Sequence, residues 1–178
     1  MRLGLKKDEV RLDVYNLEWR NEFDRVKNAI IENTNIAEHR IEHIGSTAII
    51  GMDAKPIIDI LVGVNDISNF DAGIVNGLKN IGFLRLKVQR PGEIVFARFT
   101  DETYLVKTHF IHLVEYKEEL WNNLVFFRDY LNSNEDARLE YSKVKKDYLV
   151  KSSTGANEYT EHKEAFVKKI FNLRLKGV

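Results

Sequence analysis

The segment 41–64 constrains the fold more than any other part of the chain, because it holds two apolar runs joined by a glycine-containing bend. The first run, 41–44, leads into Gly45-Ser46, and the second, 57–64, follows Lys55-Pro56. Runs of this length and composition predict two strands with a loop between them. The second run carries one charged residue, Asp59, among five aliphatic neighbours. A buried charge has to be paired or bind a cation, so Asp59 is a candidate functional residue.

The Gly45-Ser46 bend is a candidate phosphate-binding site. Glycine has no side chain, so backbone N–H groups can approach a phosphate closely, and the serine adds a hydroxyl. Twelve residues separate Ser46 from Asp59, and at that spacing the bend and the carboxylate can face one another. A triphosphate held at the bend could then share a Mg²⁺ ion with Asp59. Lys55 adds a compensating positive charge at the start of the strand.

Length and composition exclude several classes of protein. A chain of 178 residues fits a single domain, 1–178. Lys plus Arg and Asp plus Glu are both 27, so no overall charge attracts nucleic acid or an anionic membrane. Cysteine is absent, which excludes disulfides, thiolate metal sites and thiol nucleophiles. No apolar run approaches ~20 residues and residues 1–7 lack the apolar region of a signal peptide, so we expect a cytoplasmic protein without a membrane partner.

The periodicity of apolar residues predicts the order of the elements. Residues 10–15 alternate like a strand, and Asn16 can cap a helix that ends near residues 33–35. Residues 66–68 can cap a second helix that ends at Gly82. The stretches 83–86, 94–99 and 108–114 predict neighbouring antiparallel strands, with 89–93 and 100–103 as connections. From residue 117 the pattern is helical to the end, with a break at 152–155.

These elements predict an α+β fold. Residues up to about 115 form a mixed sheet with flanking helices, and residues from about 116 to 178 form a C-terminal helical layer. Aromatic residues recur at helical spacing and are expected in the core rather than in a cofactor site. They are Trp19, Phe23, Trp121, Phe126 and Phe127.

Several separated motifs resemble the GrpB family of small bacterial proteins. They are Glu42-His43-Ile44-Gly45-Ser46-Thr47, Ala54-Lys55-Pro56-Ile57-Ile58-Asp59-Ile60, Thr108-His109 with His112-Leu113-Val114-Glu115, and Phe127-Arg128-Asp129-Tyr130-Leu131, with Asn157-Glu158-Tyr159 and Lys163 extending the likeness. The resemblance implies a nucleotidyltransferase fold of the polymerase-β type, in which Gly-Ser faces an acidic metal site. It implies Mg²⁺ at Asp59 and a nucleotide or other phosphate-containing small molecule as ligand. The implied phosphate-binding residues are Gly45, Ser46, Thr47, Lys55, Arg128 and Lys163.

The sequence departs from that superfamily at one position. Active nucleotidyltransferases of this type carry carboxylates at i and i+2 of the strand, on one face because side chains alternate. Position i+2 here is Leu61, so a two-metal site would lack a ligand. Asp53 in the loop or Glu115 after the later strand are the candidate substitutes. Whether the chain is an enzyme is therefore left open by the sequence.

The histidines give a second set of candidates. His109 and His112 are three residues apart in a predicted strand, so they point to opposite faces. We expect His112 to share a face with Asp59 and to act as a general base or a metal ligand. His109 is better explained as a buried structural residue, while His43 and His112 each fit either a functional or a structural role. A metal site of His43, His112 and Asp59 is a further possibility without support from spacing.

Other charged candidates each have a structural explanation. Asp59 could pair with Lys55 or Arg98 rather than bind a cation. Arg98 is either a phosphate ligand or the solvent side of an edge strand. Arg128 and Lys163 fall on helices rich in charge, where a solvated face is the ordinary explanation.

Three functions follow from these residues. The first is a nucleotidyltransferase-like protein that binds a nucleotide with Mg²⁺ and transfers a nucleotidyl group, with Asp59 and His112 as catalytic residues. The second is a degenerate form that binds a ligand or a protein without chemistry, and Leu61 motivates it. The third and weakest is a histidine-based, metal-dependent hydrolase. Nucleic acid is an unlikely partner, since no basic stripe interleaved with aromatics occurs.

Overall fold

A computed structural model describes residues 2–88, 90–152 and 154–177. Met1, Gln89 in the predicted 89–93 connection and Ser153 in the predicted 152–155 break lie outside the described residues. The elements run, in chain order, β1 (Leu5–Lys6), α1 (Glu18–Thr34), a 3₁₀ turn (Glu38–Arg40), β2 (Ile41–Ile44), a 3₁₀ turn (Ser46–Ala48), β3 (Ile58–Val64), α2 (Ala72–Asn80), β4 (Phe83–Arg85), β5 (Ile94–Phe99), β6 (Val106–Glu115), α3 (Glu119–Ser133), α4 (Glu135–Lys151) and α5 (Ala156–Leu175).

The sheet is mixed, as the sequence predicts. Within the described residues its strands lie in the order β2-β3-β6-β5-β4, with β1 paired to β6. The β3–β6 pair is parallel, and the β2–β3, β5–β6 and β4–β5 pairs are antiparallel. The predicted α+β class, with a C-terminal helical layer, is therefore confirmed.

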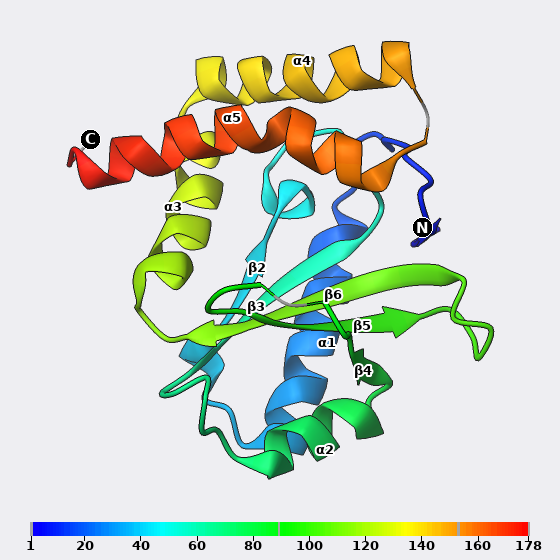
Figure 1. Ribbon diagram of the computed structural model, residues 1–178, viewed down its shortest axis with the longest axis vertical. Helices are drawn as coiled ribbons and strands as arrows, with labels where there is room; N and C mark the ends of the chain where they lie inside the picture. Colours follow the sequence, from blue (N-terminus) through cyan, green and yellow to red (C-terminus); the bar gives the residue numbers. More distant parts are fainter. Residues whose placement is uncertain (1, 89, 153, 178) are drawn as a thin grey trace.

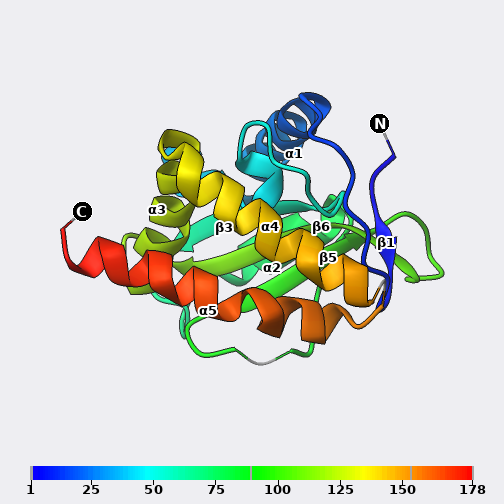
Figure 2. The same cartoon turned by 90° about the horizontal axis from the view of Figure 1, so that it is seen from above.

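Helices cover the sheet in two groups (Figure 1). Helices α1 and α2 pack with β3 and β6 in the largest apolar cluster, which includes Trp19, Ile60 and Leu78. Helices α3, α4 and α5 form a second layer, in which Phe127 and Phe166 pack together. Figure 2, seen from above, shows α4 and α5 running beside each other across the molecule on the side away from α1.

The first long helix follows the sequence prediction closely. The Asn16 side chain accepts a hydrogen bond from the Glu18 N–H at 2.9 Å, and α1 ends at Asn35, whose φ of 58° is left-handed. Asparagine tolerates that conformation better than most residues, which explains the stop. The predicted inward positions, Trp19, Phe23, Val26 and Ile30, are all buried.

The predicted strand at 10–15 is wrong. This segment is extended, but it joins the sheet nowhere, and its backbone pairs through Asp13, which exchanges hydrogen bonds with Ala54. Val14 is 78% exposed, whereas Val10 packs against Tyr148 and Tyr159 of the helical layer. Alternation of apolar and polar residues fits an extended segment on a surface as well as a strand. The pattern shows which face is buried, but it does not show whether another strand pairs with the segment.

The predicted start of the second helix is also wrong. Asp66 accepts hydrogen bonds from the backbone N–H groups of Ser68 and Asn69, which makes a turn rather than a helix cap. The helix begins at Ala72, where the Asp71 side chain accepts from Gly73 N–H at 2.8 Å. Two aspartates lie within one short segment, and the second is the cap.

No described helix combines the length and apolar character needed to cross a bilayer.

Candidate functional site

Asp59 lies directly against the Gly45-Ser46 bend. The antiparallel pairing of β2 and β3 places Asp59 opposite Ile44, the residue before the bend. Gly45 has a φ of 70°, a conformation that L residues rarely adopt, and a Cβ at this position would overlap the Asp59 carboxylate oxygen Oδ2. A glycine is therefore required here for two reasons, backbone conformation and space. The structure thus brings together the bend and the carboxylate that the sequence expects to face one another.

The other oxygen of Asp59 contacts His112. His112 Nε2 lies 3.4 Å from Asp59 Oδ1, and His112 Nδ1 makes a short contact with Glu93 Oε1. Carboxylates accept hydrogen bonds, so an imidazole held between two of them donates from both nitrogens and carries a positive charge. Burial lowers the pKa of His112, but the hydrogen bonds and charges of Asp59 and Glu93 outweigh it and raise the pKa to about 9.

The prediction that His112 is a neutral general base therefore needs correction. His112 does share a face with Asp59, and His109 points to the other face, as alternation in a strand requires. An imidazolium between two carboxylates has no free lone pair with which to accept a proton or bind a metal ion. Its structural effect is to fix the Asp59 carboxylate and to cancel part of its charge.

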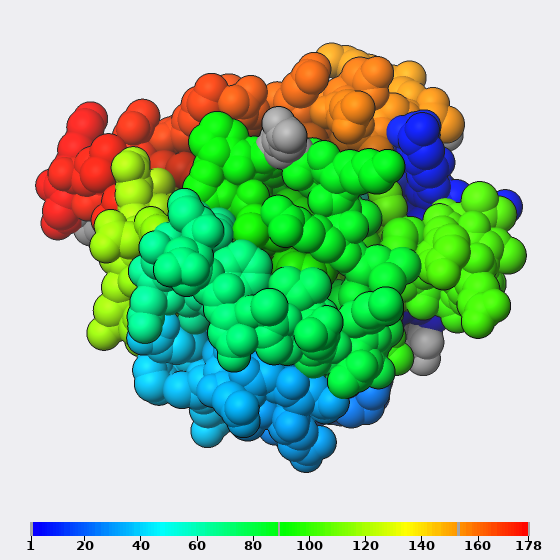
Figure 3. Space-filling view, turned by 60° about the horizontal axis from the view of Figure 1, so that its bottom comes forward, coloured from blue at the N-terminus to red at the C-terminus, as the bar shows by residue number. Residues whose placement is uncertain are grey.

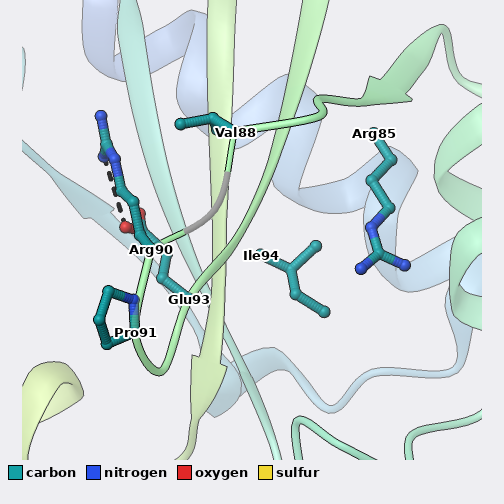
Figure 4. A pocket seen from close by; sticks show the side chains of 6 residues that line it. All are labelled: Arg85, Val88, Arg90, Pro91, Glu93 and Ile94. Carbon is teal, nitrogen blue, oxygen red and sulfur yellow. Dashed lines mark hydrogen bonds and ion pairs between the residues drawn. The ribbon is translucent and has the colours of Figure 1, made fainter.

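Glu93 comes from the connection between β4 and β5. Its side chain is 9% exposed and also lies 3.3 Å from Arg90. Burial would raise the pKa of Glu93, but the hydrogen bonds and charges of His112 and Arg90 together outweigh it and the pKa is lowered. A surface hollow of about 490 Å³ adjoins this connection, with Arg85 across from the Arg90–Glu93 pair (Figure 4). None of the other residues near Asp59 lines this hollow, so it is not the candidate site.

Two lysines lie on one aromatic ring near Asp59. The Nζ of Lys55, from the loop before β3, lies 4.1 Å from the centre of the Tyr159 ring, and the Nζ of Lys163, from α5, lies 4.3 Å from it. Burial is the main cause that lowers the pKa of each to about 8, and the negative charge of Asp59 opposes that shift in both. The positive charge of Lys163 lowers the pKa of Lys55 further, which indicates that the two ammonium groups are close.

A third lysine lies behind them. Lys145 of α4 is fully buried; its ammonium donates to the backbone oxygen of Asp53 and lies 5.0 Å from the centre of the Tyr141 ring. Burial, followed by the charge of Lys163, lowers its pKa to about 7. Within residues 2–88, 90–152 and 154–177, no carboxylate forms an ion pair with Lys55, Lys145 or Lys163.

Tyrosines complete the wall of this cluster. Burial raises the pKa of Tyr141 to about 12, while its hydrogen bond to the Ser46 side chain acts in the opposite direction. Tyr141 also packs with Ile49 and Met52, which follow the bend, in one apolar cluster. We call Lys55, Lys145 and Lys163, with Tyr141 and Tyr159, the lysine cluster. Figure 3 shows one face of the molecule, on which the green segment of residues 80–100 lies below the orange first half of α5.

His43 and Thr47 lie next to the bend but point away from Asp59. The His43 ring stacks on Phe23 of α1 at a centroid distance of 4.8 Å, and His43 Nε2 lies 3.0 Å from Thr47 Oγ1. Burial lowers the pKa of His43 to about 4, so the ring is neutral at pH 7. The Thr47 hydroxyl is already engaged, and Thr47 is 3% exposed. Both side chains stabilise the bend from the α1 side of the sheet.

His109, Arg98 and Glu115 are also placed away from Asp59. His109 is buried beside Phe83, hydrogen-bonds Thr108 and lies near Glu22 of α1. Arg98 is opposite His109 in the β5–β6 pair and therefore belongs to the same face. Glu115 ends β6 and accepts a hydrogen bond from Ile67 N–H, at the far end of β3 from Asp59. The metal set of His43, His112 and Asp59 is not assembled, because His43 and His112 lie on opposite faces.

Arg128 and Asp53 have partners of their own. Arg128 Nη1 lies 2.6 Å from Glu42 Oε2 and donates to the His43 carbonyl at 3.0 Å, which joins α3 to β2. Asp53 pairs with Lys146 at 2.8 Å and does not replace the missing second carboxylate. Leu61, at that missing position, is fully buried among Ile44, Val114 and Trp121.

The sequence analysis missed three members of the site. Glu93 is in a connection that reads as an ordinary turn, and Lys145 and Tyr141 are in a helix with a charged composition. Tyr141 and Lys145 are four residues apart, so they share a helix face, which is a signal for a paired aromatic and cation. Nothing in the spacing of Glu93 points to His112.

Comparisons with known proteins agree with this fold. The family model described as GrpB protein matches residues 9–173. The glutamate-rich protein GrpB of Alkalihalophilus pseudofirmus is 42% identical over 173 residues, which covers 96% of this chain and 98% of the relative.

Two solved structures are similar. The crystal structure of the conserved protein GrpB from Enterococcus faecalis matches with a TM-score of 0.75 and 26% identity, over 94% of this chain and 98% of that one. The structure of Cid1 in complex with its short product ApU matches with a TM-score of 0.50 and 14% identity, over 75% of this chain and 42% of that one. The second likeness concerns the fold alone.

Proposed function

The chain belongs to the GrpB family, and from the charges gathered at its Gly45-Ser46 bend we propose that it binds a nucleotide or another phosphoanhydride there. The ligand would lie between the bend, Asp59 and the lysine cluster. The nucleotidyltransferase fold of the chain is consistent with this position, but the proposal rests on the side chains of this protein.

The observation that carries the proposal is a set of ammonium groups that form no ion pair with a carboxylate of the described residues. Lys55 and Lys163 converge on Tyr159 at 4.1 and 4.3 Å, and Lys145 lies behind them with a carbonyl as its hydrogen-bond acceptor. Buried ammonium groups without counterions destabilise a fold, and their lowered pKa values express this cost. A polyphosphate would supply the missing negative charge.

The bend would hold the other side of the ligand. Gly45 leaves the backbone open to close approach, and the half-buried Ser46 adds a hydroxyl. Lys55 and Lys163 are partly exposed as residues, and in this proposal an anion that enters from solvent reaches their ammonium groups. Each of the two lysines would act as a point charge on the phosphates.

Binding without nucleotidyl transfer is the form of the proposal that the residues favour. Transfer by two metal ions needs a second carboxylate, and Leu61 at that position is fully buried in an apolar cluster. The histidine-based hydrolase is not supported, because His43 and His109 face α1 while His112 faces Asp59. Transfer of a nucleotidyl group to an acceptor remains the reaction to assay once a ligand is found.

The proposal is tested by calorimetric titration of the purified protein. ATP, GTP, CTP, UTP and inorganic pyrophosphate are each titrated with and without Mg²⁺. We expect saturable binding of at least one of these probes. Binding should fall at least about tenfold in Lys163→Met, since a direct charge–phosphate contact is typically stabilising by 1.5–3 kcal/mol, or roughly 10- to 100-fold in affinity.

A matched control separates the site from overall charge. Lys168 lies on the same helix, and its side chain is 68% exposed and paired with Glu164. Lys168→Met therefore also removes one positive charge, but at the protein surface. It should leave the affinity nearly unchanged. Absence of binding by the wild-type protein to all five probes under both conditions refutes the proposal.

A further inference from the structure

The donor set around Asp59 fits a divalent metal ion poorly. Mg²⁺ prefers oxygen ligands in an octahedral arrangement and is usually held in phosphate sites by one or two carboxylates. Asp59 is the one carboxylate on its strand, and Leu61 occupies the position of the second. Among the residues that the structure describes, no three His, Asp or Glu side chains are grouped closely enough to hold a metal ion.

Both oxygens of Asp59 already have neighbours. Oδ1 lies 3.4 Å from His112 Nε2, and Oδ2 lies against the Gly45 backbone. The second His112 nitrogen is held by Glu93, so the ring cannot turn away without breaking a second buried contact. A metal ion at Asp59 would have to displace this ring or lie beside a positive charge.

Positive charge is supplied by side chains instead. Lys55, Lys145 and Lys163 add three ammonium groups to the His112 imidazolium, against the carboxylates of Asp59 and Glu93. Asp53 is neutralised separately by Lys146. With all these groups charged, the site has an excess of positive charge before any metal ion is added. The excess matches an anion with several negative charges, such as a free pyrophosphate or triphosphate chain.

We infer that this site binds its polyphosphate in the metal-free form, with lysine side chains in the role that magnesium ions have in two-metal nucleotidyltransferases. The inference rests on the proposed function and specifies the form of the ligand. Lys55 and Lys163 contact the phosphates. Lys145 is a positioning residue: it has no exposed surface, and it acts through its charge on Lys163 and through its contact with Tyr141.

The test compares the metal-free form of each ligand with its Mg²⁺ complex. Pyrophosphate and ATP are titrated calorimetrically into the wild-type protein in EDTA and in excess MgCl₂ at the same ionic strength. We expect binding in EDTA that is at least as tight as in MgCl₂, since complexation by Mg²⁺ removes two negative charges from the ligand. Affinity in EDTA should also fall as salt is added, because the contacts are ionic.

A variant on α4 tests the buried charge. Lys145→Met keeps the length and apolar stem of the side chain and removes the ammonium group, and we expect it to weaken binding in EDTA by about tenfold. Lys143→Met, an exposed position on the same helix, is the matched control and should change the affinity little. Thermal unfolding of both variants verifies that each is folded before it is titrated.

The outcomes separate the inference from the proposed function. Binding in MgCl₂ with none in EDTA overturns the inference and leaves the proposed function intact. No binding under either condition refutes both. Equal weakening by Lys145→Met and Lys143→Met also overturns the inference, because it makes the effect one of general charge rather than of the lysine cluster.

Discussion

The buried ammonium of Lys145 gives a quantitative prediction about stability. Lys145 is fully buried, with the Asp53 backbone oxygen as its hydrogen-bond acceptor and the Tyr141 ring 5.0 Å away. Burial and the charge of Lys163 lower its pKa from 10.5 to about 7. In the unfolded chain the same group keeps its ordinary pKa, so the two states bind different numbers of protons between pH 7 and 10.5.

The sign of the effect follows from that difference. Between these pH values the unfolded chain holds a proton that the folded chain has lost, so this group makes the folded state more stable as pH rises. The slope is about 1.4 kcal/mol per pH unit, which amounts to about 5 kcal/mol over the interval. Below pH 7 both states are protonated and the folded state bears the full cost of a buried charge.

Lys145→Met removes this dependence. Methionine does not titrate, and it leaves the Asp53 carbonyl without a donor, at a cost of about 1–3 kcal/mol. At pH 7 the variant should therefore be more stable than wild type by about 2–4 kcal/mol. The advantage should shrink as pH rises and reverse near about pH 9.

Urea unfolding of both proteins at several pH values between about 6.5 and 10 measures the difference. Lys143→Met, exposed on the same helix, should follow the wild-type curve with a constant offset. If the free energies of unfolding of Lys145→Met and wild type differ by the same amount at every pH, the ammonium of Lys145 does not titrate as a buried group and the reasoning fails.

Three further predictions address the residues around the bend. Gly45→Ala should lower the free energy of unfolding by about 2 kcal/mol or more, because its φ of 70° and the neighbouring Asp59 oxygen leave no room for a Cβ; an unchanged urea midpoint would contradict this. His112→Gln should be destabilised by about 3 kcal/mol at pH 6, because the nearly buried Glu93 and the partly exposed Asp59 lose their shared cation. The pKa of His112 is raised to about 9, so this contribution is fully present below pH 6.5 and is lost as pH rises through 9, and pH-dependent unfolding of the two proteins should converge accordingly. Arg128→Gln should cost about 1–3 kcal/mol by breaking the link between α3 and β2, yet leave pyrophosphate affinity unchanged; a large loss of affinity in calorimetry would place Arg128 in the binding site.

Local sequence predicts the juxtaposition of Asp59 and the bend because both lie on adjacent antiparallel strands. In such a hairpin-like pair the register follows from the length of the connection and from which face is buried. Ile44 and Asp59 are opposite each other, so the residue after Ile44 has to pass over the carboxylate. Glycine at position 45 is the sequence signature of that close approach.

The protonation state of His112 could not be read from the sequence in the same way. It depends on Glu93, which is 19 residues away and reaches the site through the β5–β6 pairing. A histidine on a strand beside one carboxylate fits a general base, whereas the same histidine between two carboxylates is a cation. The chemistry of the residue was set by a contact that has no local pattern.

The lysine cluster could not be predicted from the sequence either. Lys55, Lys145 and Lys163 come from a loop and two helices, and a lysine in a charged helix is ordinarily solvated. Burial of Lys145 results from the packing of α4 on α5 and on the loop before β3. Lys145 continues the buried stripe of Ala137, Tyr141 and Tyr148, but a lysine in such a stripe does not by itself indicate burial. The misassigned strand at 10–15 has the same cause, because pairing partners are a property of the tertiary fold.

Leu61 and His112 together account for the positive charge that we propose for this site. The two residues are partners in the β3–β6 register. At the position where the resemblance implies a second carboxylate, this chain has an apolar side chain that packs into the core, and the neighbouring strand supplies a cation held by Asp59 and Glu93. A carboxylate pair without metal ions would repel a polyphosphate, whereas one carboxylate bound to an imidazolium beside three ammonium groups would attract it. Leu61 alone would only remove a possible metal ligand. Together with the positive charges of His112 and the lysine cluster, it is the reason we expect the proposed polyphosphate site to work without metal ions.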